Sequence, residues 1–428
     1  KIIMDYGKEV KVHQIDSSTF IVDNRVEFKL QPNTAYRTNL KLMNVGFRDT
    51  ANQGAEANRL LGALGQIKAV RFVDKGVDVS KQNFFSHYMA FSNQVGKNSV
   101  KNNVLDELHQ TSVGREVEMT TSEAAGGNPA DKAASTTIGK QLGVTHFPVT
   151  LTNNENQSAS LELSRVIPLF SVMSHIPTNL FNDAKIVVEF YDSVSAQEFC
   201  GTDIRVRPSN ATLDPIMYLE AEEALGAEAQ AAMDNVSNVS WNEIEHDQVH
   251  IERATQNVEQ QKTLRIKGYD NKSLGRLMLI KEVEAAGRVT GNTNDGYGRV
   301  NSPAQKANKI NYFCNGKALL AGDGADTDAS RLAITSDAMG PMVGYMGMNN
   351  LSISNQNNWL GAGNALVGQA DYFVVNIGKR VQNLQVKHNR TPTGAPGAGD
   401  NMALDLHFYG EVGKSMVVSG GSYSVVYN

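Results

Sequence analysis

Cysteine is scarce in this sequence of 428 residues, and its scarcity limits the chemistry that the chain can perform. The two cysteines, Cys200 and Cys314, lie far apart and outside any Cys-x-x-Cys spacing. This excludes a disulfide framework within the chain and a zinc site built on cysteine. We therefore interpret both residues as inert thiols in a reducing compartment.

Long apolar runs and an excess of positive charge are also missing. No stretch of about 18 apolar residues occurs, so the sequence predicts neither a transmembrane segment nor a secretory signal. The 40 Lys and Arg residues are outnumbered by 45 Asp and Glu residues, which gives a formal net charge of −5. A chain with this balance has no overall attraction for phosphate, which disfavours a dedicated nucleic-acid binder.

One histidine pair has the spacing of a metal site on a helix. His246 and His250 are four residues apart among acidic neighbours, but Asp247 stands where the metalloprotease motif requires Glu. Val249 and Ile251 alternate with His250, which predicts a strand, where residues four apart are separated by about 13 Å. We therefore expect no metal site here.

An acidic loop is the other candidate for an ion. Asp323, Asp326 and Asp328 could reach one calcium ion, although the EF-hand spacing and its closing Glu are absent. A solvated loop is the simpler interpretation, and calcium binding stays open. The glycine-rich segments 291–298 and 394–399 lack the phosphate-loop motif, and no Gly-x-Ser-x-Gly elbow occurs. The sequence thus predicts no catalytic, cofactor-binding or metal-binding residue, and no enzyme.

The apolar residues that are present mostly alternate with polar ones in short runs, which is typical of half-buried strands. The predicted strands are residues 19–22, 26–30, 40–43, 67–73, 147–151, 249–251, 264–267, 277–283, 372–377, 384–386, 404–408 and 422–426. An all-β fold explains them better than alternating βαβ units. The length exceeds what one hydrophobic core normally supports, so we expect two domains.

Two segments depart from this alternation and predict short helices. Residues 81–95 place aromatic and apolar side chains at helical intervals. Residues 220–233 are rich in Ala and Glu, which are strong helix formers, and lie near the midpoint of the chain. The expected organisation is a first domain over residues 1–222, a helical connector over 223–240 and a second domain over 241–428.

Long polar connections and a weak internal echo complete the pattern. Residues 120–139, 287–309, 321–340 and 391–401 are rich in Gly, Asn, Ser, Thr and Pro, which predicts long loops. The Phe-Tyr pairs at residues 190–191 and 408–409 end similar alternating segments late in each half. Residues 67–74 and 277–283 are comparable early strands, so duplication of one domain is a reasonable hypothesis.

Several segments, taken in order, resemble a known family. Arg165-Val-Ile-Pro-Leu-Phe-Ser-Val, then Ile176-Pro-Thr-Asn-Leu-Phe-Asn-Asp, then Lys185-Ile-Val-Val-Glu-Phe is similar to a pattern in double jelly-roll major capsid proteins. These occur in large DNA viruses, virophages and polinton-like viruses. Residues 215–222 match the strand that closes the first jelly roll, and residues 411–427 match the closing hairpin of the second. Residues 291–370 have no counterpart in the pattern.

The resemblance implies two tandem jelly-roll β-sandwich domains with short inserted helices and long loops. It further implies a homotrimer that forms a pseudo-hexagonal capsomer of an icosahedral double-stranded DNA virus shell, assembled inside the host cell. The expected partners are neighbouring capsomers, penton proteins and minor capsid proteins, with no sequence-specific nucleic acid and no cofactor.

Two alternatives remain open from the sequence. A carbohydrate-binding or carbohydrate-cleaving β-sandwich protein also uses long loops, but it needs exposed aromatic side chains, and only Trp241 and Trp359 supply indole rings. A minor capsid or spike protein is the other alternative, although a single jelly roll would lack the second half of this chain.

Overall fold

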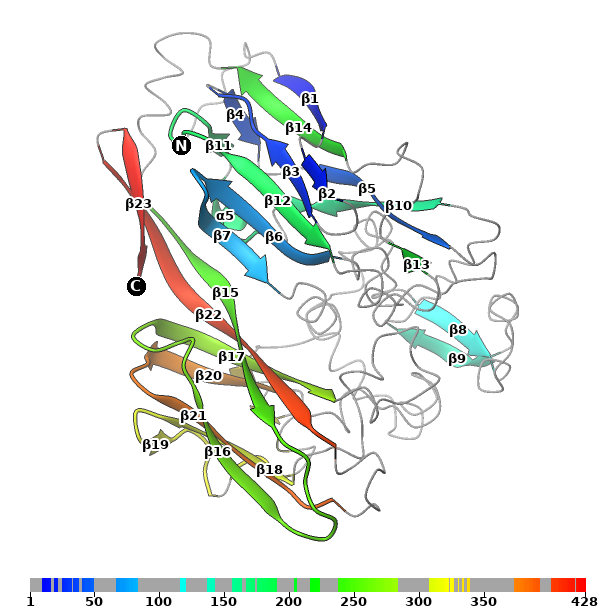
Figure 1. Cartoon of the computed structure of the whole chain (residues 1–428), viewed down its shortest axis with the longest axis vertical. Coiled ribbons are helices and arrows are strands. Elements are labelled where there is room, and N and C mark those ends of the chain that lie inside the picture. The colour runs from blue at the N-terminus through cyan, green and yellow to red at the C-terminus, as the bar shows by residue number, and fades with distance from the viewer. Residues whose placement is uncertain are drawn as a thin grey trace.

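A computed structural model gives the fold of this chain as two β-sandwiches in tandem (Figure 1). The structure describes the following residues: 10–16, 19–21, 25–32, 34–37, 41–49, 67–83, 116–120, 137–142, 156–163, 167–173, 175–190, 204–205, 216–223, 238–283, 308–322, 324–326, 330, 333–334, 337–338, 373–392, 402–419 and 421–428.

The second sandwich shows its topology most simply, because it has eight consecutive strands in two antiparallel four-stranded sheets. One sheet has the order β15-β22-β17-β20 and the other has the order β16-β21-β18-β19. Numbered along the domain, these orders are 1-8-3-6 and 2-7-4-5, which is the jelly-roll arrangement. The strands are β15 (Val239–Ile251), β16 (Gln260–Ile266), β17 (Ser273–Val283), β18 (Lys309–Cys314), β19 (Lys317–Ala318), β20 (Phe373–Arg380), β21 (Leu384–Arg390) and β22 (Leu404–Ser419).

The first sandwich repeats this topology with two of its strand positions split. β1 pairs with β14, which also pairs with β4 and β5, and these pair in turn with β11 and β10. The second sheet has the order β2-β3-β12-β6-β7. The strands are β1 (Val10–Asp16), β2 (Thr19–Ile21), β3 (Arg25–Lys29), β4 (Thr34–Arg37), β5 (Lys41–Asp49), β6 (Ile67–Asp74), β7 (Val77–Asn83), β10 (Asn156–Glu162), β11 (His175–Pro177), β12 (Lys185–Phe190) and β14 (Ile216–Glu223).

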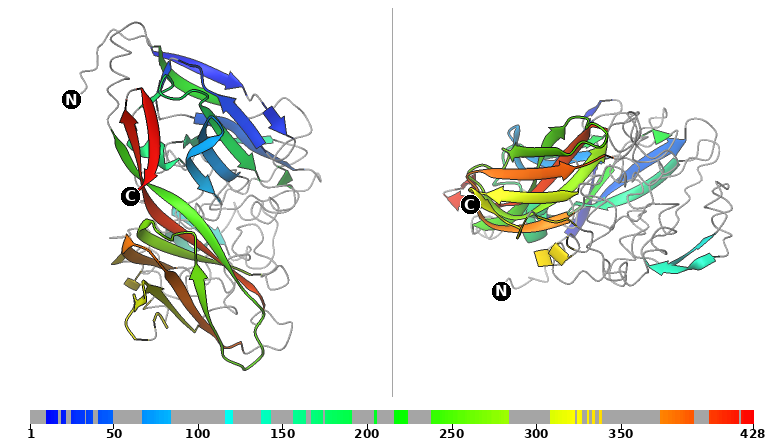
Figure 2. Two further views of the ribbon diagram at one scale, coloured as in Figure 1. Left: turned by 60° about the vertical axis from the view of Figure 1, so that its left-hand side comes forward. Right: turned by 90° about the horizontal axis from the view of Figure 1, so that it is seen from below.

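Five smaller elements lie outside these two series of strands. Helix α5 (Pro168–Val172) follows β10 and precedes β11, so it interrupts the sixth strand position of the first jelly roll. β13 (Ile204–Arg205) pairs with β5, and β8 (Glu116–Thr120) pairs with β9 (Thr137–Leu142). A last strand, β23 (Ser422–Tyr427), forms a hairpin with β22 and runs beside the first jelly roll (Figure 2).

Alternating side chains explain why these segments become strands. In β3, Val26 and Phe28 are fully buried, whereas Arg25, Glu27 and Lys29 keep solvent contact. In the second jelly roll, Leu404, Leu406, Phe408 and Val412 of β22 enter the core between the two sheets. Burying an apolar side chain of this size contributes roughly 1.5–3 kcal/mol, so the alternation fixes which face of each strand points inward.

Tight turns fix the register of two hairpins. Asn315 and Gly316 connect β18 to β19 with φ angles of 53° and 79°, and Lys75 and Gly76 connect β6 to β7 with φ angles of 49° and 79°. Two consecutive positive φ angles define a type I′ turn, whose twist matches that of the flanking strands. Asn-Gly is the sequence that this turn favours most strongly.

The all-β prediction is confirmed, and most predicted strands coincide with observed ones, although residues 147–151 lie outside the described part. Both predicted helices are wrong at their starts. Residues 81–83 belong to β7 and residues 220–223 belong to β14, because pairing with neighbouring strands overrides a local preference for helix. Residues 84–95 and 224–233 lie outside the described residues, so the helical connector and the domain boundaries stay predictions.

The internal echo compares strands that are not equivalent. Phe190 is the last residue of β12, the seventh strand position of the first jelly roll, and Tyr191 lies outside the described residues, whereas residues 408–409 lie in β22, the eighth position of the second. Residues 67–74 form a fourth strand and residues 277–283 a third strand. The duplication of topology is real, but the paired segments are similar only because alternating strands resemble one another.

The loop predicted over residues 120–139 is shorter in the structure than in the prediction, because β9 begins at Thr137.

No helix in the described part of the chain is long and apolar enough to cross a membrane.

Gly410 of β22 offers a test of the packing in the second jelly roll. A Cβ atom at this position would lie 2.5 Å from Tyr269 Cε1 and 2.7 Å from Leu274 Cδ1. We expect Gly410→Ala to lower the free energy of unfolding by roughly 1–3 kcal/mol through overpacking. In the same sheet, a Cβ at Gly275 would have no neighbour closer than 3.5 Å, so Gly275→Ala should change stability by less than about 1 kcal/mol. Urea unfolding of both variants measures this difference, and equal stabilities would contradict the packing described.

Candidate functional site: the polar junction between the two jelly rolls

The two jelly rolls meet along the beginning of β15. This strand packs against α5 and β7 of the first jelly roll before it continues into its own sandwich. In Figure 1, β15, β22 and β23 pass together beside β6, β7 and α5. The contact brings an edge strand of the first jelly roll next to an edge strand of the second.

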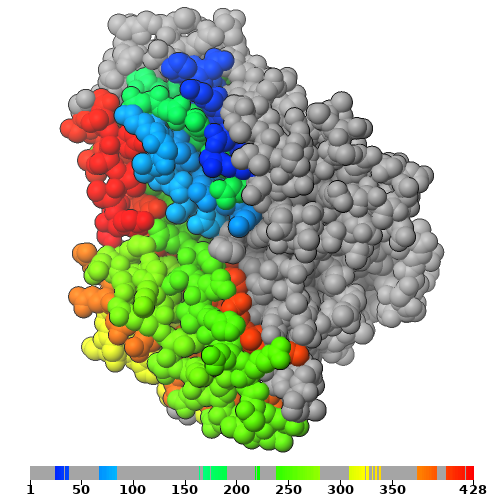
Figure 3. All heavy atoms as spheres, viewed as in Figure 1, coloured from blue at the N-terminus to red at the C-terminus, as the bar shows by residue number. Residues whose placement is uncertain are grey.

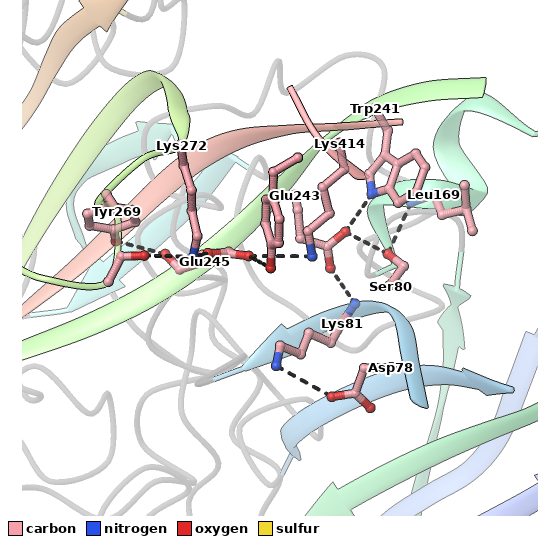
Figure 4. A network of polar contacts seen from close by, with 12 residues as sticks. Asp78, Ser80, Lys81, Leu169, Trp241, Glu243, Glu245, Tyr269, Lys272 and Lys414 are labelled. Atoms are coloured by element: carbon pink, nitrogen blue, oxygen red, sulfur yellow. Dashed lines mark hydrogen bonds and ion pairs between the residues drawn. The ribbon is translucent and has the colours of Figure 1, made fainter. Parts of the chain in front are cut away.

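Glu243 of β15 is the polar centre of this contact. Its side chain is 0% exposed, and its carboxylate accepts hydrogen bonds from Trp241 Nε1 at 2.5 Å and Ser80 Oγ at 2.9 Å. It also accepts a hydrogen bond from the backbone N–H of Lys81. The backbone N–H of Leu169 in α5 donates to Ser80 Oγ at 3.4 Å, so one carboxylate links β15, β7 and α5 (Figure 4).

These contacts satisfy a backbone group of the kind that every edge strand leaves unpaired. β7 is the last strand of its sheet among the described residues, so the outward N–H of Lys81 has no strand to pair with. An unpaired N–H buried in a domain contact costs free energy, and an exposed edge invites pairing with other chains. Glu243 satisfies this N–H with a charge-assisted hydrogen bond, and the second jelly roll covers the edge.

Lys414 of β22 supplies the opposite charge. It lies across from Trp241 in the β15–β22 register and is 5% exposed. Burial raises the pKa of Glu243, while the positive charge of Lys414 and the three hydrogen bonds act in the opposite direction. The result is a buried carboxylate whose net pKa lies above the ordinary value of 4.5.

Glu245, two residues further along the same face of β15, continues the network. It pairs with Lys272 at 2.5 Å and with Lys414 at 3.4 Å, and it accepts a hydrogen bond from Tyr427 Oη at 2.9 Å. Burial opposes ionisation of Glu245, but Lys272, Lys414 and Tyr427 outweigh this effect and lower its pKa below 4.5. The ammonium groups of both lysines lie 4.9 Å from the centre of the Tyr427 ring, which adds cation–π attraction.

The β23 strand makes a second link to the first jelly roll. Tyr423 donates a hydrogen bond to Asp74 Oδ2 at 2.7 Å, and its ring meets Phe181 edge-on at 5.0 Å. Asp74 is 3% exposed and also accepts the backbone N–H of Asp183 at 2.8 Å. Burial and the neighbouring Asp74 raise the pKa of Tyr423, so it stays a neutral donor. The junction therefore joins the sandwiches at two places.

The histidine pair considered in the sequence lies in a strand, as predicted. His246 and His250 are both in β15, where His246 Nε2 lies 2.9 Å from His407 Nδ1 and His250 Nδ1 lies 2.8 Å from Asp405 Oδ1. The two side chains thus have different partners. Within the described residues, no group of three or more potential metal ligands gathers.

The other residues singled out from the sequence have ordinary surroundings where the structure describes them. Asp326 is exposed, and Asp323 and Asp328 lie outside the described residues, so the calcium question stays untested. Cys314 is a free, buried thiol whose pKa is raised by burial, and Cys200 lies outside the described residues.

Sequence reasoning missed the junction itself. Glu243 and Glu245 share one face of β15 with Trp241, and further along with Val249, which packs against the core, and Ile251, which belongs to it. Acidic residues at the inward positions of an alternating segment are unusual, because a buried charge needs a partner. That alternation was a usable signal, but the partners Ser80 and Lys414 are distant in sequence.

Comparison with known proteins places the fold. No protein-family model and no curated protein sequence matches this chain. Solved structures do, and the class that they define is the double jelly roll.

Three solved structures show the likeness over almost the whole chain. PBCV-1 VP54, as fitted into a reconstruction of the virophage Sputnik, is 11% identical with a TM-score of 0.55 and covers 100% of this chain and 99% of its own. The mavirus major capsid protein is 10% identical with a TM-score of 0.52 and covers 100% and 91%. The Faustovirus major capsid protein is 8% identical with a TM-score of 0.52 and covers 98% and 92%. At these identities the likeness concerns the fold.

Glu243→Gln tests the importance of the junction. An amide in place of the carboxylate turns one NH₂ group toward a hydrogen-bond donor, and it removes one of the two buried negative charges, Glu243 and Glu245, that compensate the charge of Lys414. We expect the free energy of unfolding to fall by roughly 1–3 kcal/mol. The control is Glu220→Gln, because Glu220 pairs with Arg37 on the surface with 38% of its side chain exposed, and its loss should cost less than about 1 kcal/mol. Chemical denaturation measures both, and a smaller loss for Glu243→Gln would contradict the role assigned to this residue.

The two junction glutamates should have opposite effects on the pH dependence of stability. The raised pKa of Glu243 means that the folded protein binds this proton more tightly, so its contribution to stability falls as pH rises above 4.5. The lowered pKa of Glu245 gives a contribution that is present above pH 4.5 and is lost as pH falls below it. Glu245→Gln should therefore reduce the loss of stability in acid, and Glu243→Gln should reduce the loss at higher pH. Urea unfolding over a pH series checks this, and identical pH profiles would refute it.

Proposed function

We propose that this chain is a major capsid protein and a structural subunit of an icosahedral double-stranded DNA virus shell. Three copies would form a trimer in which six jelly rolls make a pseudo-hexagonal capsomer. The observation that carries the proposal is the full-length match of two jelly rolls in tandem to the PBCV-1, mavirus and Faustovirus capsid proteins.

The geometry of the chain suits such a subunit. Two sandwiches of the same topology in one chain give six similar units around a threefold axis, so a trimer approximates a hexagon, which can tile a surface. Tiling requires that both sandwiches keep one relative orientation. The buried contacts of Glu243 and Tyr423 favour this rigidity, because a hinge motion would separate the Glu243 carboxylate from its donors Ser80 and Lys81 and the Asp74 carboxylate from its donor Tyr423.

The same proposal defines the partners and the location. The capsomer would contact neighbouring capsomers, penton proteins and minor capsid proteins in the virion, after assembly inside the host cell. We propose a structural role without catalysis, cofactor or sequence-specific nucleic-acid binding. The carbohydrate-binding alternative needs exposed indole rings. One of the two in the chain does not meet this need, because Trp241 is 4% exposed and donates a hydrogen bond to Glu243 in the junction.

The mass of the purified native protein tests this proposal. Light scattering should give three times the mass of one chain, and negative-stain images of the same sample should show particles with a hexagonal outline. A compact monomer at all concentrations would contradict the capsid proposal. Measurable binding in a glycan screen by such a monomer would favour the carbohydrate-binding sandwich instead.

A further inference from the structure

The C-terminal hairpin differs from the rest of the chain in its charge. Residues 415–428, which include the end of β22 and all of β23, contain no charged side chain, although 20% of the chain is charged. Apart from Met416 and Asn428, the segment consists of Ser, Gly and Val residues and two tyrosines. It also lies at the molecular surface, next to β6 and β7 (Figure 3).

The two faces of this hairpin have different surroundings. Met416 is fully buried, and its partner Val425 and the neighbouring Tyr423 share its face, which is turned toward the junction. The opposite face is exposed, with Val417 at 37% and Val426 at 44%. This face, which we name the hairpin surface, consists of Ser240, Ser415, Val417, Ser419, Ser422, Ser424 and Val426.

The outer edge of β23 is also open among the described strands. Asn428 N–H donates to Gly413 O at 2.9 Å, which makes residues 413 and 428 a hydrogen-bonded pair of the β22–β23 ladder. Hydrogen-bonded and non-bonded pairs alternate in an antiparallel ladder, so Tyr423 and Val425 direct their backbone N–H and C=O groups away from β22. No described strand lies beyond them.

An edge of this kind is a hazard for an isolated protein. Natural edge strands are protected by lysine, proline, bulges or a covering element, and the β23 edge has none of the first three in its sequence. Uncharged β-branched segments with free backbone groups pair readily with other chains. The first jelly roll illustrates the contrast, because the outer face of its β3–β12–β6 sheet carries cross-strand ion pairs such as Lys185–Glu27 and Arg71–Glu189, whose side chains remain 18–33% exposed.

We propose that the hairpin surface and the β23 edge form a contact with a second copy of this chain. The inference rests on the proposed trimer and names a surface that closes it. Two observations favour a second copy as the occupant. The inner face of the hairpin already forms the junction, so a neighbour seated on the outer face continues that contact and clamps the hairpin on both sides. The surface also lacks any charge that would select a basic or acidic partner, and a ring of copies supplies the same hairpin at every subunit boundary.

Lysine substitutions on the hairpin surface test the proposal. Val426→Lys and Val417→Lys place a charge on exposed positions, so the melting temperature of the single chain should not change. In the trimer the same charge would be buried at the contact, so we expect the mass by light scattering to fall from three chains to one. Val258→Lys is the matched control, because Val258 is 53% exposed in the connection between β15 and β16, and it should stay trimeric.

The outcomes separate this inference from the proposed function. A wild-type monomer would refute the trimer itself. A wild-type trimer with a trimeric Val426→Lys variant, or with a monomeric Val258→Lys variant, would overturn the hairpin contact and leave the capsid proposal standing.

A photo-crosslinking residue at Ser424 identifies the occupant directly. We expect a product with the mass of two chains on a denaturing gel. A product confined to one chain would show that another segment of the same chain covers the hairpin, and a product only with another viral protein would show a different partner. Either of these results overturns the proposal.

Discussion

The structure depends on one buried carboxylate at the boundary between two sandwiches. Glu243 accepts three hydrogen bonds and faces Lys414, so its charge is compensated only when β15, β7, α5 and β22 hold their observed positions. A misplaced buried charge is far more costly than a misplaced apolar contact, which makes the arrangement specific as well as stable. The same carboxylate accepts a hydrogen bond from the edge strand β7. One contact therefore satisfies an unpaired backbone N–H of that edge and also joins the two domains.

The long strand β22 connects this junction to both ends of the second jelly roll. Leu404, Leu406 and Phe408 in its first half are core residues, whereas Lys414 and Met416 in its second half pair with β23, and Lys414 also contacts Glu245 in the junction. Because one continuous strand contributes to the core, the junction and the hairpin, a shift in any of them affects the others. We therefore expect the two sandwiches to move as one rigid block, which is the property that the proposed capsid subunit requires.

Local patterns in the sequence predicted much of the fold. Alternation in segments such as residues 277–283 and 404–408 identified strands, and the resemblance at residues 165–190 identified two jelly rolls. The helix predicted from residue 220 failed at its start, because β1 and β4 pair with this segment and no local pattern records that pairing. The echo between the Phe-Tyr pairs failed for a related reason, since alternation identifies a strand but not its position in a sheet. The junction depends on Ser80 meeting Glu243 across 163 residues, which only the folded chain reveals.

The most direct test of the account is a cryo-electron microscopy reconstruction of the purified assembly. The account predicts a threefold particle with six sandwich densities around the axis, two from each chain, joined within each chain by continuous density at Glu243 and Tyr423. A reconstruction with another symmetry, or with two sandwiches that move independently within one chain, would contradict it.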